Sequence, residues 1–302
     1  MREDKLLPAE LWEEFRRHVT GEVFLNEEMA RHTTIQTGGA AACFFYPQHT
    51  ADIKRALTFC SHHRQRYFIL GNGSNLLFPD RGYSGLVIAT GRLRGLRLEK
   101  DGLTARAGET INSLLDAANA FGYRGLNFLA GIPGTVGGAV VVNAGIPQAS
   151  IGDVTSEVTV LDRSGTVRIL SQSDCRFSYR HSGIRDDGLI VLWVRFNLTD
   201  KQPYDRRLLL AQRAIKQPLT YPSAGCVFVN PGGLSAGELI EKADLKGFTV
   251  KRAKVSTKHA NFILNLGGAK SADILKVIDI TQKKVYKRFN IKLKLEIEVV
   301  CD

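Results

Sequence analysis

Apolar residues recur along this chain with two periods, and their alternation predicts a mixed α and β architecture. Residues 7–19 and Ile53–Cys60 have helical spacing, and each segment precedes a strand-like run. Between about residues 85 and 200, short β-rich runs alternate with glycine turns, which predicts many short strands. The clearest of these runs are Gly85–Ile88, Leu103–Ala107, Val154–Leu161 and Leu189–Phe196.

The region after residue 270 has the most regular helical pattern. Ser271–Asp273 predicts the start of a helix, and the apolar residues that follow on one face are Ile274, Ile278, Val285 and Phe289. The basic cluster Lys283–Arg288 falls near the end of this helix, where the helix dipole is negative. The pattern therefore predicts a long amphipathic helix.

Residues 292–299 alternate between apolar and polar side chains, which predicts a strand. The alternation puts Glu296 and Glu298 on one face, opposite Leu293, Leu295, Ile297 and Val299. Both carboxylates are therefore expected to face away from the core. From the pattern alone, a solvated strand face is the simpler interpretation and a catalytic role is the alternative.

Length and composition indicate a folded chain with more than one unit. The 302 residues, 44% apolar and 24% charged, suffice for two or three folding units and are typical of neither disorder nor a disulfide scaffold. The polar, basic, proline-containing segment Thr199–Pro222 predicts a domain junction near residue 200. No apolar run approaches membrane-spanning length and no signal-peptide pattern follows Met1, so we expect a cytoplasmic protein with no membrane partner.

The cysteines favour free thiols over a metal or disulfide site. They are five in number and widely spaced, without a C-x-x-C pair: Cys43, Cys60, Cys175, Cys226 and Cys301. Cys226 stands out because glycine and proline bracket it in Tyr221–Pro231. A thiol so placed can be an acid, a nucleophile or a small buried side chain, and its partners decide which. We expect the other four to be small buried hydrophobic side chains.

The net charge of +11, from 41 basic and 30 acidic residues, admits nucleic acid, anionic lipid or a phosphorylated small molecule as partner. The basic residues are scattered, apart from brief clusters at Arg206–Arg213 and Lys283–Arg288, and no RNA-binding motif with interleaved aromatic residues occurs. The net charge alone does not distinguish among these partners, but the scattered distribution of basic residues favours an anionic cofactor over nucleic acid.

Two glycine-rich segments carry the cofactor signal. In Ile69–Leu77 an apolar run ends in Gly-Asn-Gly-Ser-Asn, whose main-chain N–H groups suit phosphate, although G-x-G is also a common loop. Leu129–Gly145 is more distinctive, because glycines, a proline and a threonine precede an apolar run and an Asn-Ala-Gly turn. Neither the dinucleotide fingerprint G-x-G-x-x-G nor a P-loop motif occurs, so a phosphate cradle of another kind is predicted.

Further motifs follow one another along almost the whole chain. They are His32–Thr34 with Gly38–Gly39, Gly71–Leu76, Gly131–Gly145, Phe177–Arg180, Ser223–Pro231, Lys258–Phe262 and Leu295–Val299. In this order the motifs resemble the UDP-N-acetylenolpyruvoylglucosamine reductase (MurB) family of flavoenzymes. The spacing between Arg180 and Cys226 is similar to that of the shorter form of the family, which lacks an extra insert.

The resemblance implies an α+β fold with an FAD-binding module of two subdomains, of the vanillyl-alcohol oxidase/PCMH type, and a C-terminal α+β substrate-binding domain. The corresponding ranges are 1–80, 81–200 and 201–302. It implies FAD and NADPH as cofactors and no metal. The implied cofactor-binding residues are Gly71, Asn72, Gly73, Ser74, Asn75, Leu76, Gly131, Pro133, Gly134, Thr135, Gly137, Gly138, Asn143, Ala144 and Gly145.

The resemblance also implies a reaction, in which the enolpyruvyl ether of a UDP-sugar receives a hydride at C3 and a proton at C2. Arg180 and Glu298 are implied to stabilise the developing negative charge, and a carboxylate helps only while it holds a proton. Cys226 is implied as the proton donor, because a thiol with a pKa of about 8.5 is a better acid than a hydroxyl. Glu296 lies outside this catalytic trio.

Four more residues match family positions near the substrate or the nicotinamide, namely Tyr179, Asn230, His259 and Asn261. Aromatic packing, a turn or a structural histidine are the simpler alternatives for these residues. Gln36 and Val229 stand where the family often has a basic residue. The remaining candidates for the phosphate-binding cations are Lys216, Lys251, Arg252 and Lys258.

Two rival interpretations keep part of the pattern. Another FAD-dependent oxidoreductase of the same fold would share the glycine motifs only. A basic nucleic-acid-binding protein is the more remote alternative and rests on the net charge of +11 alone. We expect a monomer that binds a small-molecule substrate and no nucleic acid.

Overall fold

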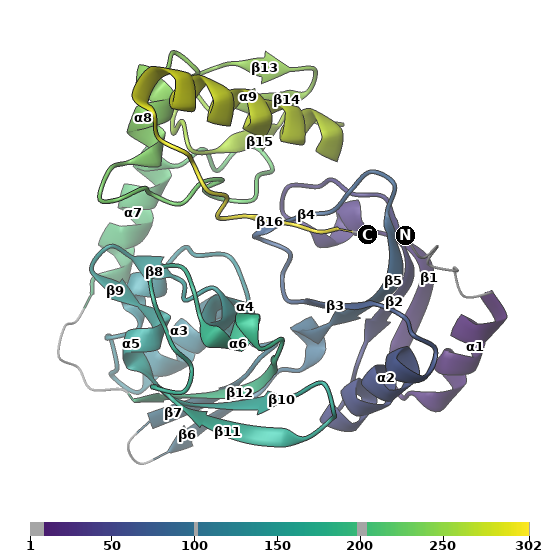
Figure 1. The fold of residues 1–302 in the computed structure, drawn as a ribbon. Coiled ribbons are helices and arrows are strands. Elements are labelled where there is room, and N and C mark those ends of the chain that lie inside the picture. The colour runs from purple at the N-terminus through teal and green to yellow at the C-terminus, as the bar shows by residue number, and fades with distance from the viewer. Residues whose placement is uncertain (1–8, 100–101, 198–203, 302) are drawn as a thin grey trace. The chain divides into compact units, whose positions relative to one another are not determined.

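The computed structural model describes residues 9–99, 102–197 and 204–301, which form two compact units (Figure 1). Neither unit is continuous in the sequence. Unit 1 comprises the described residues up to Asn26, those of Ala42–Asn72 and those of Ser84–Leu210. Unit 2 comprises Glu27–Ala41, Gly73–Tyr83 and the described residues from Ala211 onward. The division into ranges 1–80, 81–200 and 201–302 stays a prediction.

Unit 1 contains most of the strands and several helices. Its described helices are α1 (Ala9–His18), α2 (Thr50–His62), α3 (Ile111–Ala120), α4 (Val136–Val141), α5 (Ile151–Val154), α6 (Gly183–Asp186) and the start of α7 (Arg206–Lys216). Three of its described strands extend into unit 2, namely β1 (Glu22–Glu28), β2 (Ala40–Tyr46) and β5 (Tyr83–Ala89). The others are β3 (Tyr67–Leu70), β6 (Leu96–Glu99), β7 (Gly102–Arg106), β8 (Gly145–Ile146), β9 (Ala149–Ser150), β10 (Thr155–Leu161), β11 (Val167–Ser171) and β12 (Ile190–Asn197). The predicted helices and strands of this region are confirmed over the described residues, and residues 7 and 8 of the first predicted helix lie outside them.

Two larger sheets organise unit 1. One has the strand order β1-β2-β5-β3, in which β3 and β5 are parallel. The other is antiparallel, with the order β11-β10-β12-β7-β6. Helices α1 and α2 pack their apolar faces on the first sheet, where Phe15 of α1 meets Phe45 of β2 edge-to-face at 5.2 Å.

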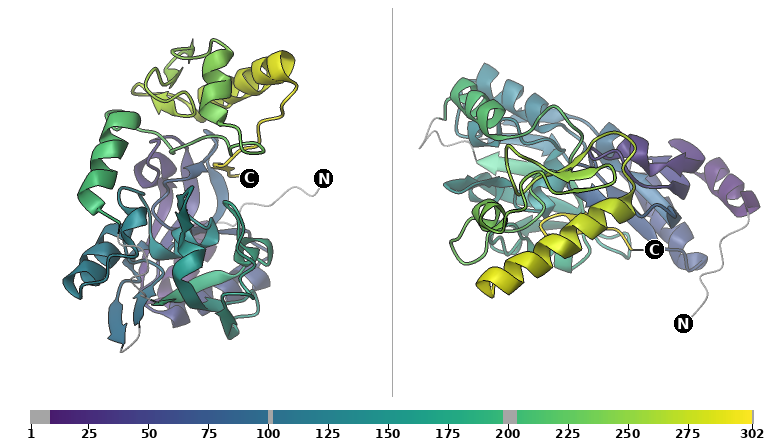
Figure 2. Two further views of the ribbon diagram at one scale, coloured as in Figure 1. Left: turned by 90° about the vertical axis from the view of Figure 1, so that its left-hand side faces the viewer. Right: turned by 90° about the horizontal axis from the view of Figure 1, so that it is seen from above.

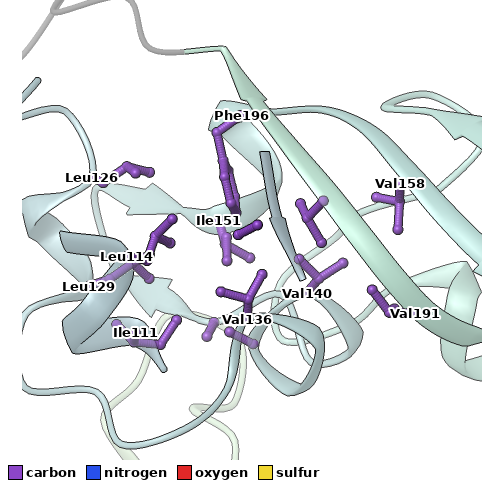
Figure 3. Close-up of a cluster of buried hydrophobic side chains, with 14 of the residues drawn as sticks. Ile111, Leu114, Leu126, Leu129, Val136, Val140, Ile151, Val158, Val191 and Phe196 are labelled. Atoms are coloured by element: carbon purple, nitrogen blue, oxygen red, sulfur yellow. The ribbon is translucent and has the colours of Figure 1, made fainter. Parts of the chain in front are cut away.

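Strand β12 lies between two hydrophobic cores of unit 1. Val191 and Val194 belong to a core with α3 and α4, part of which is shown in Figure 3. Ile190 and Leu192 belong to the other core, with α1 and α2. The register with β10 shifts between Trp193 and Val191, and this bulge turns both valines to the same face. Because both faces are covered, β12 is almost continuously apolar.

The described core of unit 2 combines a small antiparallel sheet with two helices. Strands β13 (Thr249–Val250), β14 (Ala253–Val255) and β15 (Ile263–Asn265) form the sheet, and α8 (Ala236–Lys242) and α9 (Ser271–Phe289) complete the core. The long helix α9 crosses β13 and β14 and is seen from two further directions in Figure 2. A separate parallel pair joins β16 (Glu298–Val299) to β4 (Leu76–Leu77). Both units therefore combine helices and sheets, as predicted.

The predicted helix after residue 270 is confirmed as α9, which begins at Ser271 and buries Ile274, Ile278 and Val285. Asp80 caps its first turn, because its carboxylate accepts hydrogen bonds from the N–H groups of Ser271 (2.7 Å) and Ala272 (3.0 Å). The sequence gives no local sign of this cap, since Asp80 lies 191 residues earlier in the chain.

The predicted strand over residues 292–299 is wrong in its length, because the chain bends at Glu296 and Ile297. Before the bend, the Val229 N–H donates to Lys294 O (3.0 Å) and the Glu296 N–H donates to Val227 O (2.8 Å). After the bend, Glu298 pairs with β4 instead. The change of partner breaks the alternation, and Leu295 remains 36% exposed.

Candidate active site

The two glycine-rich motifs meet inside unit 1, at Gly71 and Thr135. Gly71 follows β3, and Thr135 is the N-cap residue of α4. A Cβ atom added to Gly71 would lie 2.6 Å from the Thr135 hydroxyl oxygen, so any larger residue would push the two motifs apart. The main chain at Gly71 therefore carries no side chain and lies next to the Thr135 hydroxyl group, and we call this arrangement the Gly71–Thr135 cradle. Such a cradle fits the phosphate groups of a dinucleotide cofactor.

Some main-chain N–H groups of the Gly131–Gly138 segment already donate hydrogen bonds within unit 1. The N–H groups of Val136 and Gly137, in the first turn of α4, donate to the carbonyl oxygens of Glu109 (2.8 Å) and Ala107 (2.9 Å). These two donors therefore hold the segment on the neighbouring strand end. Any phosphate contact has to come from the rest of the segment.

The second half of the Gly71–Leu76 loop belongs to unit 2 and packs against the His32–Thr34 motif. Gly73 has a φ of +63°, and a Cβ there would lie 2.0 Å from His32 O, so the position requires glycine. The Thr34 N–H donates to Gly73 O (3.1 Å), and the Thr34 hydroxyl donates to Ser223 O (2.7 Å). Thr34 thereby joins the loop to the segment that leads to Cys226.

Asn75, predicted as a cofactor residue, holds the segment that carries Glu298. Its side-chain Nδ2 donates to Glu296 O (3.0 Å), and its carbonyl oxygen accepts the Glu298 N–H (2.9 Å). Glu298 then pairs with Leu76 in the parallel β4–β16 bridge. The structure thus brings the end of the first glycine motif next to a predicted catalytic carboxylate, which is half-buried.

Arg180 lies at the tip of a tight turn in unit 1, which we call the Arg180 turn (residues 178–181). Ser178 and His181 close the turn by exchanging two main-chain hydrogen bonds, of 3.0 and 3.1 Å. The Arg180 guanidinium lies 5.6 Å from the ring centre of Tyr179, which is 57% exposed. Arg180 has a φ of +56°, a left-handed conformation that costs an arginine about 1–2 kcal/mol.

Cys226 lies on an extended stretch of unit 2, which we call the Cys226 segment (residues 225–229). Cys226 itself is half-buried and forms an antiparallel bridge with Phe262. On the other edge of the segment, Val227 O accepts the Glu296 N–H. Cys226 is therefore adjacent to one partner of this bond, and Glu298 is two residues beyond the other.

Asn261 holds the Cys226 segment through a side-chain amide that replaces main-chain pairing. It is 3% exposed, and its Oδ1 accepts the Phe228 N–H (2.9 Å) while its Nδ2 donates to Phe228 O (2.8 Å). Its own carbonyl oxygen accepts the Val227 N–H (2.9 Å). Both ends of the buried amide are thus hydrogen-bonded to the Phe228 main chain within unit 2.

Two other predicted substrate residues of unit 2 also have partners. The Asn230 Oδ1 accepts the Ala236 N–H (2.9 Å) at the start of α8. The His259 Nδ1 accepts the Asn261 N–H (3.3 Å), which places the proton of the neutral ring on Nε2. Burial lowers the pKa of His259 below its ordinary value, and the charge of Lys246 lowers it further.

All five cysteines are free thiols, as predicted. Cys43, Cys60 and Cys175 are buried, and burial raises the pKa of Cys175 to about 11 and that of Cys60 to about 12. The prediction of a buried side chain was wrong for Cys301, which is exposed. Cys301 follows β16 near the end of the described chain, where no further element covers it.

Two of the four candidate phosphate-binding cations have protein partners. Lys258 Nζ donates to Ala214 O (2.6 Å), and Lys251 Nζ lies 3.4 Å from the Asp273 carboxylate. Lys251 is exposed, so this ion pair is weak and open to exchange with another anion.

Two family profiles match the chain in succession. Residues 41–171 match the FAD binding domain, and residues 217–300 match the C-terminal domain of UDP-N-acetylenolpyruvoylglucosamine reductase. The UDP-N-acetylenolpyruvoylglucosamine reductase of Moorella thermoacetica is 42% identical over 281 residues, which cover 92% of this chain and 93% of that protein. The chain belongs to the UDP-N-acetylenolpyruvoylglucosamine reductase family.

Other members of this reductase family agree in length and fold. The protein from Heliobacterium modesticaldum is 40% identical over 292 residues, which cover 95% of this chain and 93% of that protein. The crystal structure of the Thermus caldophilus reductase is 35% identical, covers 92% of this chain and 98% of its own, and has a TM-score of 0.75. The predicted family is confirmed, and with it an oxidoreductase that carries an FAD-binding domain.

A more distant structure shows the fold alone. A VAO-type flavoprotein from Myceliophthora thermophila is 14% identical, covers 98% of this chain and 64% of its own, and has a TM-score of 0.55. Together with the matched FAD binding domain, this likeness confirms the predicted fold class. None of the described helices is long and apolar enough to cross a bilayer.

Sequence reasoning missed Ser182 and Asp80 and noted Thr34 only as part of the His32–Thr34 motif, although all three fix the predicted site. Ser182 donates to Val141 O, Thr34 connects Gly73 with Ser223, and Asp80 caps α9. The partners of Ser182 and Thr34 are 41 and 189 residues away in the chain. No local pattern in the sequence could have shown these contacts.

Proposed function

We propose that this protein is an NADPH-dependent flavoenzyme that reduces the enolpyruvyl ether of UDP-N-acetylglucosamine-enolpyruvate to UDP-N-acetylmuramate, a peptidoglycan precursor. The family assignment supports the substrate, since curated relatives with 38–42% identity bear the name of this reductase. The observation that carries the proposal is the hydrogen-bonded pairing of the Cys226 segment with the chain just before Glu298. This pairing supports our assignment of a candidate proton donor and a candidate charge-stabilising carboxyl group to one site.

The residues that we propose to hold FAD are the two glycine motifs. The Gly71–Thr135 cradle supports a diphosphate contact, and the loop from Gly71 to Leu76 offers further main-chain and hydroxyl donors. When bound, FAD would accept a hydride from NADPH and deliver it to C3 of the enolpyruvyl group.

We assign the developing negative charge to Arg180 and Glu298. After hydride addition, the substrate carboxylate carries extra electron density that a guanidinium at hydrogen-bond distance would stabilise. Glu298 can donate a hydrogen bond to the same group only as the neutral acid. The proposed roles thus require one permanent cation and one protonated carboxyl group.

We assign the final proton to Cys226. Its S–H bond breaks, a C–H bond forms at C2 of the substrate, and the thiolate recovers its proton from solvent. Together with the hydride, this proton converts the carbon–carbon double bond to a single bond. The thiol, and not the thiolate, is the useful form, so no base is needed to activate it.

We extend the same proposal to four further residues, Tyr179, His259, Asn230 and Asn261. Tyr179 is exposed beside Arg180, which suits a substrate contact, and the His259 Nε2–H is a candidate donor. The Oδ1 of Asn230 and both ends of the Asn261 amide already have partners in unit 2, so a substrate contact at these atoms would have to be shared. NADPH as reductant, the cytoplasm as location and a monomeric state stay predictions.

An anaerobic half-reaction titration tests the function. We expect the yellow, oxidised protein to lose its visible absorbance when NADPH is added. Absorbance should then return stoichiometrically with the enolpyruvyl UDP-sugar. A flavoenzyme of the same fold with another substrate would be bleached but not reoxidised by this sugar, and a nucleic-acid-binding protein would show no flavin absorbance.

The cofactor site has its own test in Gly71→Ala. The added methyl group would push against the Thr135 hydroxyl, and overpacking costs about 1–3 kcal/mol, so we expect FAD to bind about 5- to 150-fold more weakly. Quenching of flavin fluorescence during titration of the apoprotein measures this affinity. The double variant Gly71→Ala with Thr135→Ala relieves the clash and should recover part of the loss. Unchanged FAD affinity in Gly71→Ala would exclude this cradle as the cofactor site.

A further inference from the structure

Asn143 was predicted to bind the cofactor, but both ends of its side chain are occupied by the protein. It is 5% exposed, and its Nδ2 donates to Ser178 O (2.8 Å) while its Oδ1 accepts the Gly152 N–H (3.0 Å). Asn143 itself has a φ of +45°, a left-handed conformation that asparagine tolerates better than most residues. Its amide therefore bridges two main-chain segments.

One of these segments is the Arg180 turn. Ser178 O, the acceptor of the Asn143 amide, also accepts the His181 N–H that closes the turn (3.1 Å). The Asn143 bond thus fixes the first residue of a turn whose third residue is Arg180. Because Arg180 adopts a left-handed φ of +56°, the turn needs such support to keep an arginine at its tip.

The other side of the turn is fixed to the same part of the chain. The Ser182 hydroxyl donates to Val141 O (2.7 Å), in the last turn of α4, and Ser182 is fully buried. Gly152 also packs closely here, since a Cβ on it would lie 2.6 Å from the Phe177 ring. The first residue of the turn and the residue after it are therefore both tied to residues 141–143, at and just after the end of α4.

From this geometry we infer that Asn143 is a positioning residue for Arg180 and not a cofactor ligand. It holds the Arg180 turn so that the guanidinium is presented in one orientation. The inference rests on the proposed role of Arg180 at the substrate carboxylate. Displacement of a catalytic group by about 1 Å can cost on the order of 100-fold in rate.

The test uses Asn143→Gly, which keeps the left-handed backbone accessible and removes the side chain with both of its hydrogen bonds. We expect a normal flavin spectrum, normal FAD content and normal bleaching by NADPH. Reoxidation by the enolpyruvyl UDP-sugar should slow on the order of 100-fold. Asn127→Ala is the control, because Asn127 is an equally buried amide of unit 1 whose Nδ2 donates to Tyr204 O, away from the turn (3.0 Å). This control should reoxidise at the normal rate.

A double-mutant cycle separates positioning from independent effects. If Asn143 acts through Arg180, Asn143→Gly slows reoxidation in the wild-type background but adds little to Arg180→Ala. Equal slowing in both backgrounds would overturn the inference and leave the role of Arg180 intact. Normal reoxidation in Arg180→Ala would overturn the proposed function of Arg180 as well. Loss of FAD from Asn143→Gly would instead identify Asn143 as a cofactor ligand.

Asn143→Asp keeps the experiment decisive if the glycine variant does not fold. The carboxylate still accepts the Gly152 N–H but has no hydrogen to donate to Ser178 O. The same selective loss in the sugar half-reaction is expected, and a normal rate would contradict the inference.

Discussion

The Arg180 turn and the Cys226 segment are each held by a buried asparagine amide, but they place backbone strain on different residues. In the turn, the predicted catalytic residue itself has the left-handed φ of +56°. In the segment, the left-handed residue is Gly225, with a φ of +77°, and Cys226 next to it is extended and paired with Phe262. Glycine adopts such a φ at little cost, whereas arginine does not.

This difference relates to what each residue has to do. Arginine has a long, flexible side chain, so a fixed backbone helps to limit the orientations of its guanidinium group. A strained turn that several hydrogen bonds hold in place provides such a backbone. A thiol has a single rotatable bond and needs only a fixed strand beneath it. The two asparagines, Asn143 and Asn261, therefore meet different demands with the same chemistry.

The largest expected effect is on proton donation by Cys226, and it tests whether the Cys226 segment carries a catalytic acid. Cys226→Ala should slow reoxidation of the flavin by the enolpyruvyl sugar by about 10²- to 10⁴-fold, because the proton donor is lost. Bleaching by NADPH should be unchanged. Stopped-flow absorbance measures both half-reactions, and Cys301→Ala, which removes an exposed thiol, is the control. Normal reoxidation in Cys226→Ala would mean that the segment positions something other than an acid.

The next effect tests the carboxylate that lies beyond the Cys226 segment. Glu298→Ala should lower the rate of reoxidation by about 10²- to 10³-fold, as expected for the loss of one charge-stabilising donor. Glu296→Ala should be mild, because Glu296 lies outside the proposed catalytic trio and its main-chain bonds to Asn75 and Val227 remain in the variant. The two variants are compared in the same single-turnover assay. If Glu296→Ala were the more damaging change, the proposed trio would be wrong.

Backbone strain gives a smaller effect, of opposite sign in the two regions. Arg180→Gly should raise the free energy of unfolding by up to about 1 kcal/mol while reoxidation is lost, because glycine relieves the left-handed strain. Gly225→Ala should lower it by about 1 kcal/mol, although no atom lies within 4 Å of the added Cβ. Urea unfolding of both variants checks the signs. A stability loss in Arg180→Gly would show that side-chain contacts outweigh the strain.

The smallest effect concerns His259, next to the Cys226 segment. Burial lowers its pKa in the folded protein, whereas the unfolded chain keeps a value of about 6.5. Since the unfolded chain binds the proton first, the stability that neutral His259 contributes is present above about pH 6.5 and is lost as the pH falls through the lowered pKa. The urea midpoint of the wild type should therefore fall more steeply below pH 6.5 than that of His259→Gln. Parallel curves would contradict this.

The sequence predicted local features well because they depend on neighbouring residues. The amphipathic pattern after Ser271 predicted α9, and the β-rich run Leu189–Phe196 predicted β12. The motif order also predicted the family. The bend at Glu296 was not predictable, since it arises where the chain changes partner from Val227 to β4.

The sequence predicted candidate site residues but not the hydrogen bonds that hold them in place. Asn143 and Asn261 both stood out in the sequence, but the structure shows each bound to main-chain atoms 33–35 residues away. Such contacts depend on how distant segments fold together, and periodicity carries no information about them. The discontinuous composition of the two units escaped prediction for the same reason.

The pairing of β4 with β16 affects when unit 2 can fold during translation. Asn75 and its hydrogen-bond partner Glu296 are 221 residues apart. Asp80 and its partner Ser271 at the start of α9 are 191 residues apart. Because a chain leaves the ribosome from its N-terminus, residues 27–41 and 73–83 emerge long before the segment that completes unit 2. We expect these early segments to depend on chaperones during translation, and a chain that stops before Glu298 to leave unit 2 open to proteolysis.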